Sequence, residues 1–167
     1  MRVLGPMVVL LLASTVLAQD DPRQPYSPPS SAPKYLRLVT SASGTTAKPG
    51  AKVSLFVDIV PNPGIHVYAP GAKEYVPIAL TLGPQKDMTA RPTIYQKSEL
   101  LWFAPLNETV PVYQTAFRLT REVMIARSVK SGMTLKLTGT VDYQACDDKV
   151  CFKPESVPVN WTIAVNR

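Results

Sequence analysis

The chain has 167 residues, with 18 Lys and Arg against 12 Asp and Glu, and is long enough for one domain with a sizeable core but not for two full domains. Its 17 prolines disfavour a helical bundle, because proline breaks helices and central strands. One histidine and two cysteines are too few for a four-ligand zinc site or a disulfide-dense miniprotein, and we expect no metal and no cofactor. No two Lys or Arg residues are adjacent, so the net charge of +6 is spread thinly and no nucleic-acid partner is expected.

Residues 1–18 have the features of a secretory signal peptide. Arg2 supplies a positive start, an apolar stretch follows over residues 7–17, and Ala18 ends a Val-Leu-Ala sequence that a signal peptidase can read. The stretch is shorter than the roughly 20 apolar residues of a membrane span, so an uncleaved anchor is the less favoured alternative. We expect secretion, a mature chain that begins at Gln19, and no membrane span after signal removal.

Residues 19–34 read QDDPRQPYSPPSSAPK, with five prolines in sixteen positions. Such a proline-rich polar segment cannot bury a core, and it predicts an extended, flexible tail. The globular domain is therefore expected over residues 35–167.

The pattern of this domain is an alternation of apolar and polar residues with period two. Such alternation indicates strands with one buried face, and the breaks between the runs hold Pro-Gly and Ser-Gly turn sequences. The clearest runs have the apolar members Val53, Leu55, Val57 and Ile59; Phe117, Leu119, Val123 and Ile125; Leu135, Leu137, Val141 and Tyr143; Val157, Val159, Trp161, Ile163 and Val165. We count seven to nine strands and no amphipathic helix. The prediction is an all-β, antiparallel two-sheet sandwich, with a closed barrel as the alternative.

The two cysteines are the chemical centre of the sequence. Cys146 and Cys151 lie between the predicted strands 133–143 and 157–165, and the four residues between them can form a tight loop that brings the sulfurs within bonding distance. A secreted chain with two cysteines is expected to oxidise them to each other. As a staple, so short a loop contributes only about 2 kcal/mol, whereas a short, loop-borne bridge is of the kind that is exchanged. The residues alone leave a staple and a redox pair equally open, and a metal site that adds Asp147 and His66 would have an unusual ligand set.

A resemblance to a known family favours the redox pair. Residues 141–154, VDYQACDDKVCFKP, resemble the redox loop of the N-terminal periplasmic domain of the thiol:disulfide interchange protein DsbD, and residues 48–50 and 63–70 resemble its early part. The resemblance covers residues 35–167 and implies an immunoglobulin-like β-sandwich. It also implies that the cysteine pair cycles between disulfide and dithiol, reduced by a thioredoxin-like domain that a membrane domain feeds. The family then reduces periplasmic partners, including disulfide isomerases and the thioredoxins of cytochrome c maturation.

The resemblance also implies site residues. Cys146 and Cys151 match the redox cysteines, while His66 and Tyr68 match aromatic positions beside the pair. Tyr95 falls in a segment, residues 94–98, that resembles the cap loop shielding the sulfurs.

Two further residues belong to the predicted site. Tyr143 begins the Tyr-Gln-x-Cys element, and Asp147 follows the first cysteine directly. Asp147 is either a turn former or a negative charge that keeps a thiolate unfavourable until a partner docks. His66, if protonated, would lower the pKa of a neighbouring thiol.

Two functions are consistent with these features. The first is a thiol:disulfide exchange module of the bacterial periplasm, a component of a protein-disulfide reductase, that passes electrons between thioredoxin-like partners. Its partners would be a thioredoxin-like or membrane electron-donor protein and periplasmic thiol-disulfide proteins. Because no membrane domain follows the cysteines, we expect the electron source to be another protein. The alternative is a non-catalytic interaction module in which the disulfide is a structural staple.

Overall fold

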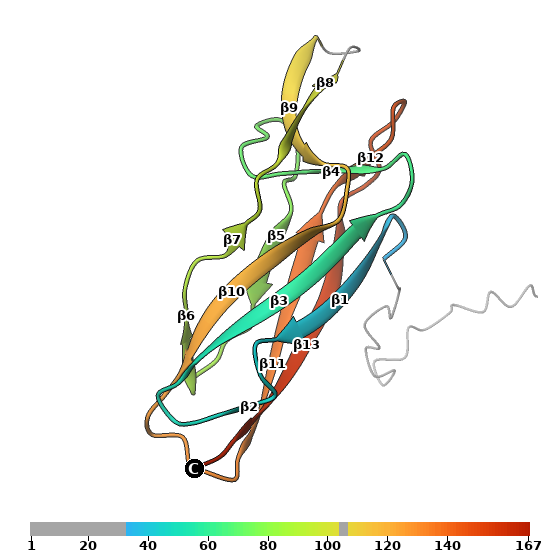
Figure 1. The fold of residues 1–167 in the computed structure, drawn as a ribbon. Coiled ribbons are helices and arrows are strands. Elements are labelled where there is room, and N and C mark those ends of the chain that lie inside the picture. The colour runs from blue at the N-terminus through green and yellow to red at the C-terminus, as the bar shows by residue number, and fades with distance from the viewer. Residues whose placement is uncertain (1–32, 104–106) are drawn as a thin grey trace, which may run out of the picture. The chain divides into compact units, whose positions relative to one another are not determined.

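The fold was described from a computed structural model, which describes residues 33–103 and 107–167. The predicted signal peptide, residues 1–18, and the predicted tail up to residue 32 lie outside the described residues. Within the described part the chain forms thirteen β-strands and no helix (Figure 1). Nothing in this part is a helix with the length and apolar character needed to cross a membrane.

The first sheet has five strands. Its strands pair antiparallel, and β3 lies centrally between β1 and β10. Its members in spatial order are β1 (Leu36–Ala42), β3 (Lys52–Pro61), β10 (Phe117–Ile125) and β6 (Met88–Ala90), with β7 (Ile94–Tyr95) also paired to β10.

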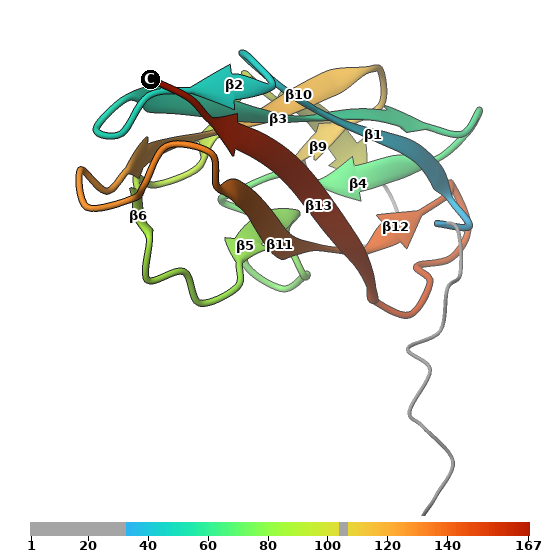
Figure 2. The ribbon, with the colours of Figure 1, turned by 90° about the horizontal axis from the view of Figure 1, so that it is seen from below.

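The second sheet faces the first across the core, as the end-on view in Figure 2 shows. It is built around the long antiparallel pair of β11 and β13, and β2 adds to β13 in parallel. Its members in spatial order are β2 (Thr46–Ala47), β13 (Glu155–Val165), β11 (Thr134–Tyr143) and β5 (Ala79–Leu82). The two sheets are open, so the predicted sandwich is confirmed over the closed alternative, with the expected all-β, immunoglobulin-like arrangement.

The core lies between these two sheets and consists of the residues that the alternation predicted. On β3, β10, β11 and β13 every apolar residue named above is buried. Trp161 ties the layers together, because its indole Nε1 on β13 donates to the carbonyl oxygens of Ser41 on β1, at 2.9 Å, and Phe56 on β3, at 3.3 Å.

A third, small sheet lies at one end of the sandwich and carries the cysteines (Figure 1). β4 continues from β3 after a turn, and β9 leads into β10, so the small sheet grows out of strands of the first sheet. Its members in spatial order are β12 (Ala145–Cys146), β4 (His66–Tyr68), β9 (Glu108–Tyr113) and β8 (Glu99–Phe103).

The sequence predicted seven to nine strands, and this number matches the longer strands of the structure alone. Eight of the thirteen described strands have four residues or more, and the other five have two or three. A strand of two or three residues is too short to show a period in the sequence, so its existence depends on the neighbour with which it pairs. The three-residue β4 likewise shows no alternation of buried and exposed side chains. All three residues of β4 are buried, because the strand lies between β12 and β9.

Candidate functional site

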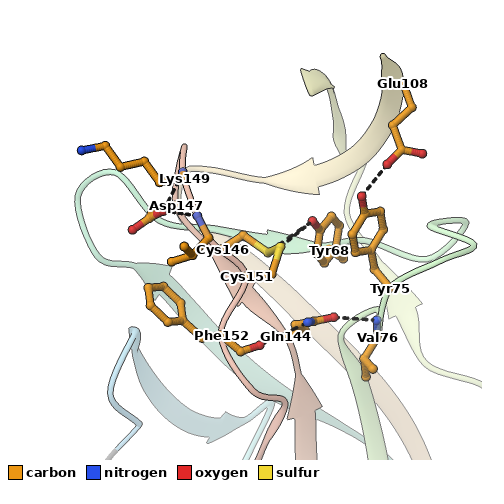
Figure 3. The surroundings of a disulfide bond; sticks show 11 residues. Tyr68, Tyr75, Val76, Glu108, Gln144, Cys146, Asp147, Lys149, Cys151 and Phe152 are labelled. Carbon is orange, nitrogen blue, oxygen red and sulfur yellow. Dashed lines mark hydrogen bonds between the residues drawn. A yellow bond between two sulfur atoms is a disulfide. The ribbon is translucent and has the colours of Figure 1, made fainter. Parts of the chain in front are cut away.

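The site is a short hairpin loop that a disulfide closes (Figure 3). Cys146 ends β12 and faces Cys151 in an antiparallel bridge, with 4.1 Å between the Cα atoms and a disulfide between the side chains. Backbone bonds close the loop on both sides of this bridge. Asp147 N donates to Val150 O at 3.0 Å, and Phe152 N donates to Ala145 O at 2.9 Å. The predicted tight loop is therefore confirmed, and the sulfurs are within bonding distance as expected.

Asp147 organises this loop from within. Its Oδ1 accepts hydrogen bonds from Lys149 N at 2.7 Å and Val150 N at 2.8 Å, which is the geometry of an Asx turn. These two backbone donors lower the pKa of the Asp147 carboxyl, so it is ionised at neutral pH. These hydrogen bonds are those of the turn-forming role considered for Asp147.

The two sulfur-bearing residues differ sharply in exposure. Cys146 is completely buried, whereas Cys151 is exposed. Cys146 packs in a small cluster with Tyr68, Val110 and Val112, which is separate from the main core. Any molecule that approaches from solvent therefore meets the side of the loop that carries Cys151.

The Tyr68 hydroxyl lies within hydrogen-bond distance of both sulfurs of the disulfide. Its oxygen lies 3.2 Å from Cys146 Sγ and 3.3 Å from Cys151 Sγ. Because disulfide sulfurs carry no proton, the hydroxyl is the donor to both. Burial raises the pKa of Tyr68, so the hydroxyl keeps its proton at neutral pH and remains a donor.

Two residues that the sequence did not indicate lie behind Tyr68. Tyr75 stacks on the Tyr68 ring, with 3.9 Å between ring centroids and 14° between planes, and its hydroxyl donates to Glu108 Oε1 (Figure 3). Tyr75 belongs to the loop between β4 and β5, which has no periodic pattern, and Glu108 begins β9. The sequence signal that could have indicated Tyr75 is the presence of an aromatic residue inside a turn-rich loop.

Gln144 connects this loop to the segment that follows the cysteines. Its Oε1 accepts from Val76 N at 3.2 Å, and its Nε2 donates to Phe152 O at 3.1 Å. Phe152 in turn stacks on Tyr35 at the start of the domain, with ring centroids 4.1 Å apart. The loop that holds Tyr75 and the loop that holds Cys151 are thus joined through one side chain.

His66 lies directly opposite Cys146 in the pairing of β4 with β12. It is 3% exposed, meets the Tyr68 ring edge-on at 5.6 Å between centroids, and has no hydrogen-bond partner for Nε2. Burial lowers its pKa, and the opposing effect of Asp148 and Asp147 is smaller. The imidazole is therefore neutral at neutral pH and does not supply a positive charge to a thiol there.

The two remaining predicted site residues belong to or pack against the main core. Tyr143 is buried in the main core, and its hydroxyl donates to the Glu155 carboxylate. Tyr95 pairs with Leu119 on β10 and packs against the main core. Among the described residues, no hydrogen bond or aromatic contact joins Tyr95 to the cysteines, and the shielding role of the segment 94–98 stays a prediction. The aromatic contact next to the disulfide comes from Tyr68 and, behind it, Tyr75.

In the part of the chain that the structure describes, no group of three or more His, Cys, Asp or Glu residues is arranged to hold an ion.

Comparison with known proteins identifies the fold. No family model matches the chain, and no curated protein matches its sequence. The N-terminal periplasmic domain of ScsB from Proteus mirabilis superposes with a TM-score of 0.53 at 13% identity, over 77% of this chain and 47% of that structure. The two share a fold. The chain spans about half the length of the ScsB structure, and the expected resemblance to an N-terminal periplasmic domain of this kind is confirmed at the level of fold.

Two further solved structures match less well. The N-terminal domain of DsbD from Neisseria meningitidis, in its reduced form, superposes with a TM-score of 0.41 at 18% identity, over 72% of this chain and 81% of that structure. The major pilin subunit BcpA of Bacillus cereus superposes with a TM-score of 0.48 at 10% identity, over 79% of this chain and 41% of that structure.

Proposed function

We propose that this chain is a thiol–disulfide exchange module of the bacterial periplasm, which passes electrons between thioredoxin-like partners through Cys146 and Cys151. The observation that carries the proposal is the asymmetry of the disulfide. One half is exposed on a loop, and the other is buried beside the hydroxyl of Tyr68. An exposed sulfur admits a nucleophile, and a buried sulfur with a donor beside it is a suitable leaving group.

The proposed reaction begins with a thiolate of the partner, which attacks Cys151 Sγ. The bond between the two sulfurs breaks, a mixed disulfide forms between the partner and Cys151, and the electron pair leaves with Cys146 Sγ as a thiolate. The partner's second thiolate then attacks its own sulfur in the mixed disulfide and releases Cys151. The partner's dithiol has become a disulfide, and this chain, after protonation of its thiolates from solvent, holds the dithiol.

Tyr68 would assist the first step. A thiolate at the position of Cys146 is shielded from water, and a buried charge without a hydrogen bond is strongly unfavourable. The Tyr68 hydroxyl is already 3.2 Å from that sulfur and keeps its proton. It can therefore donate to the thiolate as the charge develops, without moving.

The location and the partners follow from the same proposal. The signal peptide predicted over residues 1–18 would carry the chain out of the cytoplasm, with cleavage after Ala18. The fold is that of a domain described as periplasmic in ScsB. The electron donor would be a thioredoxin-like or membrane electron-donor protein, and the acceptors would be periplasmic thiol-disulfide proteins, including those of cytochrome c biogenesis.

Single-cysteine variants test the proposal. Cys146→Ser leaves the exposed thiol of Cys151, and Cys151→Ser leaves the buried thiol. Each variant is mixed with a thioredoxin that has one active-site cysteine, activated as an aromatic mixed disulfide, and the covalent complex is followed by non-reducing electrophoresis. Cys146→Ser should form the complex at least about tenfold faster than Cys151→Ser, because exposure limits attack. If neither variant forms a complex, the exchange function is wrong.

A further inference from the structure

Two further residues, Tyr75 and Glu108, form a chain of contacts behind Tyr68. Its ring is stacked against Tyr75, and the Tyr75 hydroxyl donates to Glu108. The three residues come from three different segments, namely β4, the loop before β5, and the start of β9. Figure 3 shows them in a row that begins at the disulfide and ends at the hairpin of β8 and β9.

We infer that Tyr75 and Glu108 are positioning residues, which hold the Tyr68 hydroxyl against the sulfurs so that it can stabilise the thiolate released on Cys146. The inference rests on the proposed exchange function and deepens it. Neither residue touches the reacting sulfur atoms, so each acts through the ring of Tyr68.

The packing explains why such support is needed. Tyr68, Cys146, Val110 and Val112 form a small cluster of their own, and Tyr75 is one of the partly buried residues that pack against it. The Tyr68 hydroxyl bonds to both sulfurs, which are weak acceptors, and such bonds do not fix a ring by themselves. A stacked neighbour restricts the ring from one side, and a stacked aromatic pair contributes roughly 0.5–1.5 kcal/mol beyond its burial.

Glu108 fixes that neighbour in turn. It lies on the same face of β9 as Val110 and Val112, the face that packs towards Tyr68. Its carboxylate accepts the proton of Tyr75, and burial together with this bond raises the pKa of Tyr75, so the hydroxyl remains protonated and the bond persists at neutral pH. A hydrogen bond to a charged acceptor is stronger than one between neutral groups.

Titratable residues also lie next to Cys146 in its own loop and opposite it on the neighbouring strand. His66 faces it from β4, and Asp147 and Asp148 follow it in the loop. None of these is altered in the variants below, so a change in Cys146 reactivity can be assigned to Tyr68 and the residues behind it.

The test compares Tyr75→Phe and Glu108→Ala with two matched controls. Tyr113→Phe removes the hydroxyl of another stacked, buried tyrosine, which bonds to Gln96 O away from the sulfurs. Glu99→Ala removes an exposed carboxylate from the same hairpin. Tyr68→Phe gives the effect of losing the hydroxyl itself.

Two quantities are measured for each folded variant. The first is the rate constant for reduction of the disulfide by dithiothreitol and by a thioredoxin-type dithiol protein, across pH. The second is the pKa of the Cys146 thiol in a Cys151→Ser background, from the ultraviolet absorbance of the thiolate. Tyr68→Phe should slow reduction about tenfold or more, and Tyr75→Phe and Glu108→Ala about three- to fivefold, each with a raised Cys146 pKa.

The controls should match the wild type in both quantities. Glu108→Gln keeps an acceptor for the Tyr75 proton and should restore most of the rate. The inference is overturned if Tyr75→Phe and Glu108→Ala behave as the wild type, or if Glu108→Gln is as slow as Glu108→Ala. If Glu108→Ala does not fold, Tyr75→Phe decides. A wild-type protein that dithiothreitol reduces but that exchanges with no thioredoxin-type protein would contradict the proposed function, while the dithiothreitol rates would still test the positioning.

Discussion

His66 and Asp147 flank the disulfide, and both have pKa values below their ordinary ones for different reasons. Burial favours the neutral imidazole of His66, whereas backbone donors favour the carboxylate of Asp147. Both shifts make the folded state bind protons less readily than the unfolded state. Stability therefore falls with acid in both cases, but in separate pH ranges.

For His66 the range begins near the ordinary pKa of 6.5. Below that pH the unfolded state takes up a proton at His66, while the folded state resists protonation. The contribution of the neutral His66 to the free energy of unfolding is therefore fully present above about pH 6.5, and it is lost as the pH falls towards the folded pKa. Urea unfolding at several pH values between neutral and mildly acidic should show this slope in the wild type. His66→Gln, which does not titrate, should flatten it. An equal slope in the variant would show that another group is responsible.

For Asp147, the pH range over which stability falls begins near the ordinary carboxyl pKa of 3.8 and extends below it. At neutral pH the predicted effect of substitution is local, because the carboxylate accepts hydrogen bonds from the amides of its own loop. Asp147→Ala should expose the amides of Lys149 and Val150, and their hydrogen exchange should accelerate several-fold. Asp147→Asn keeps an acceptor oxygen and should retain most of the protection. Unchanged exchange in Asp147→Ala would mean that the backbone bonds alone hold the loop.

At the scale of elements, β11 is an inner strand of the second sheet. It lies between β5 and β13 and leads directly into the cysteine loop. Gly139 stands at the point where β5 approaches, and a Cβ there would lie 2.6 Å from Thr81 O and 3.2 Å from Leu82 Cδ2. The close approach of this backbone is the reason that a glycine occupies a strand interior.

Gly139→Val should therefore destabilise the domain, because β5 cannot keep its pairing beside a branched side chain. A loss of about 1–3 kcal/mol is expected from overpacking of this kind. Urea unfolding gives the value, and Lys136→Val, on the exposed face of the same strand, is the control and should change stability little. Equal stabilities of the two variants would show that β5 can move away at little cost.

At the scale of the whole molecule, the disulfide is not part of the main core. The sandwich core is made by β3, β10, β11 and β13, whereas Cys146 belongs to the smaller cluster at one end. The cysteine loop is also held by its own backbone bonds and by Asp147. Reduction should leave the sandwich folded, which distinguishes an exchangeable disulfide from a staple.

Reduction of the wild type is expected to cost no more than about 2 kcal/mol of stability, because the closed loop is short. The reduction potential should lie above about −300 mV, within reach of cellular thiols. Thermal unfolding with and without reductant and equilibration in glutathione buffers measure the two quantities. A potential well below that value, with large destabilisation on reduction, would support the staple instead.

The sequence by itself determined the long strands and the cysteine loop. The alternation of Val53 through Ile59, or of Val157 through Val165, is a local property, because successive side chains of a strand point to opposite faces. Cys146 and Cys151 are close for an equally local reason, since only four residues separate them. The DsbD-like motif placed Tyr68 beside them, and its hydroxyl does contact both sulfurs.

Only the tertiary structure decided which cysteine is buried and what lies behind Tyr68. Cys146 is covered because β12 pairs with β4, a strand about 80 residues earlier in the chain. Tyr75 and Glu108 meet across 33 positions, and Tyr95 pairs with Leu119 on β10. A periodic pattern records which side of a strand is buried but not which strand lies next to it. That choice is made by packing between distant segments, and it determines the surroundings of the disulfide.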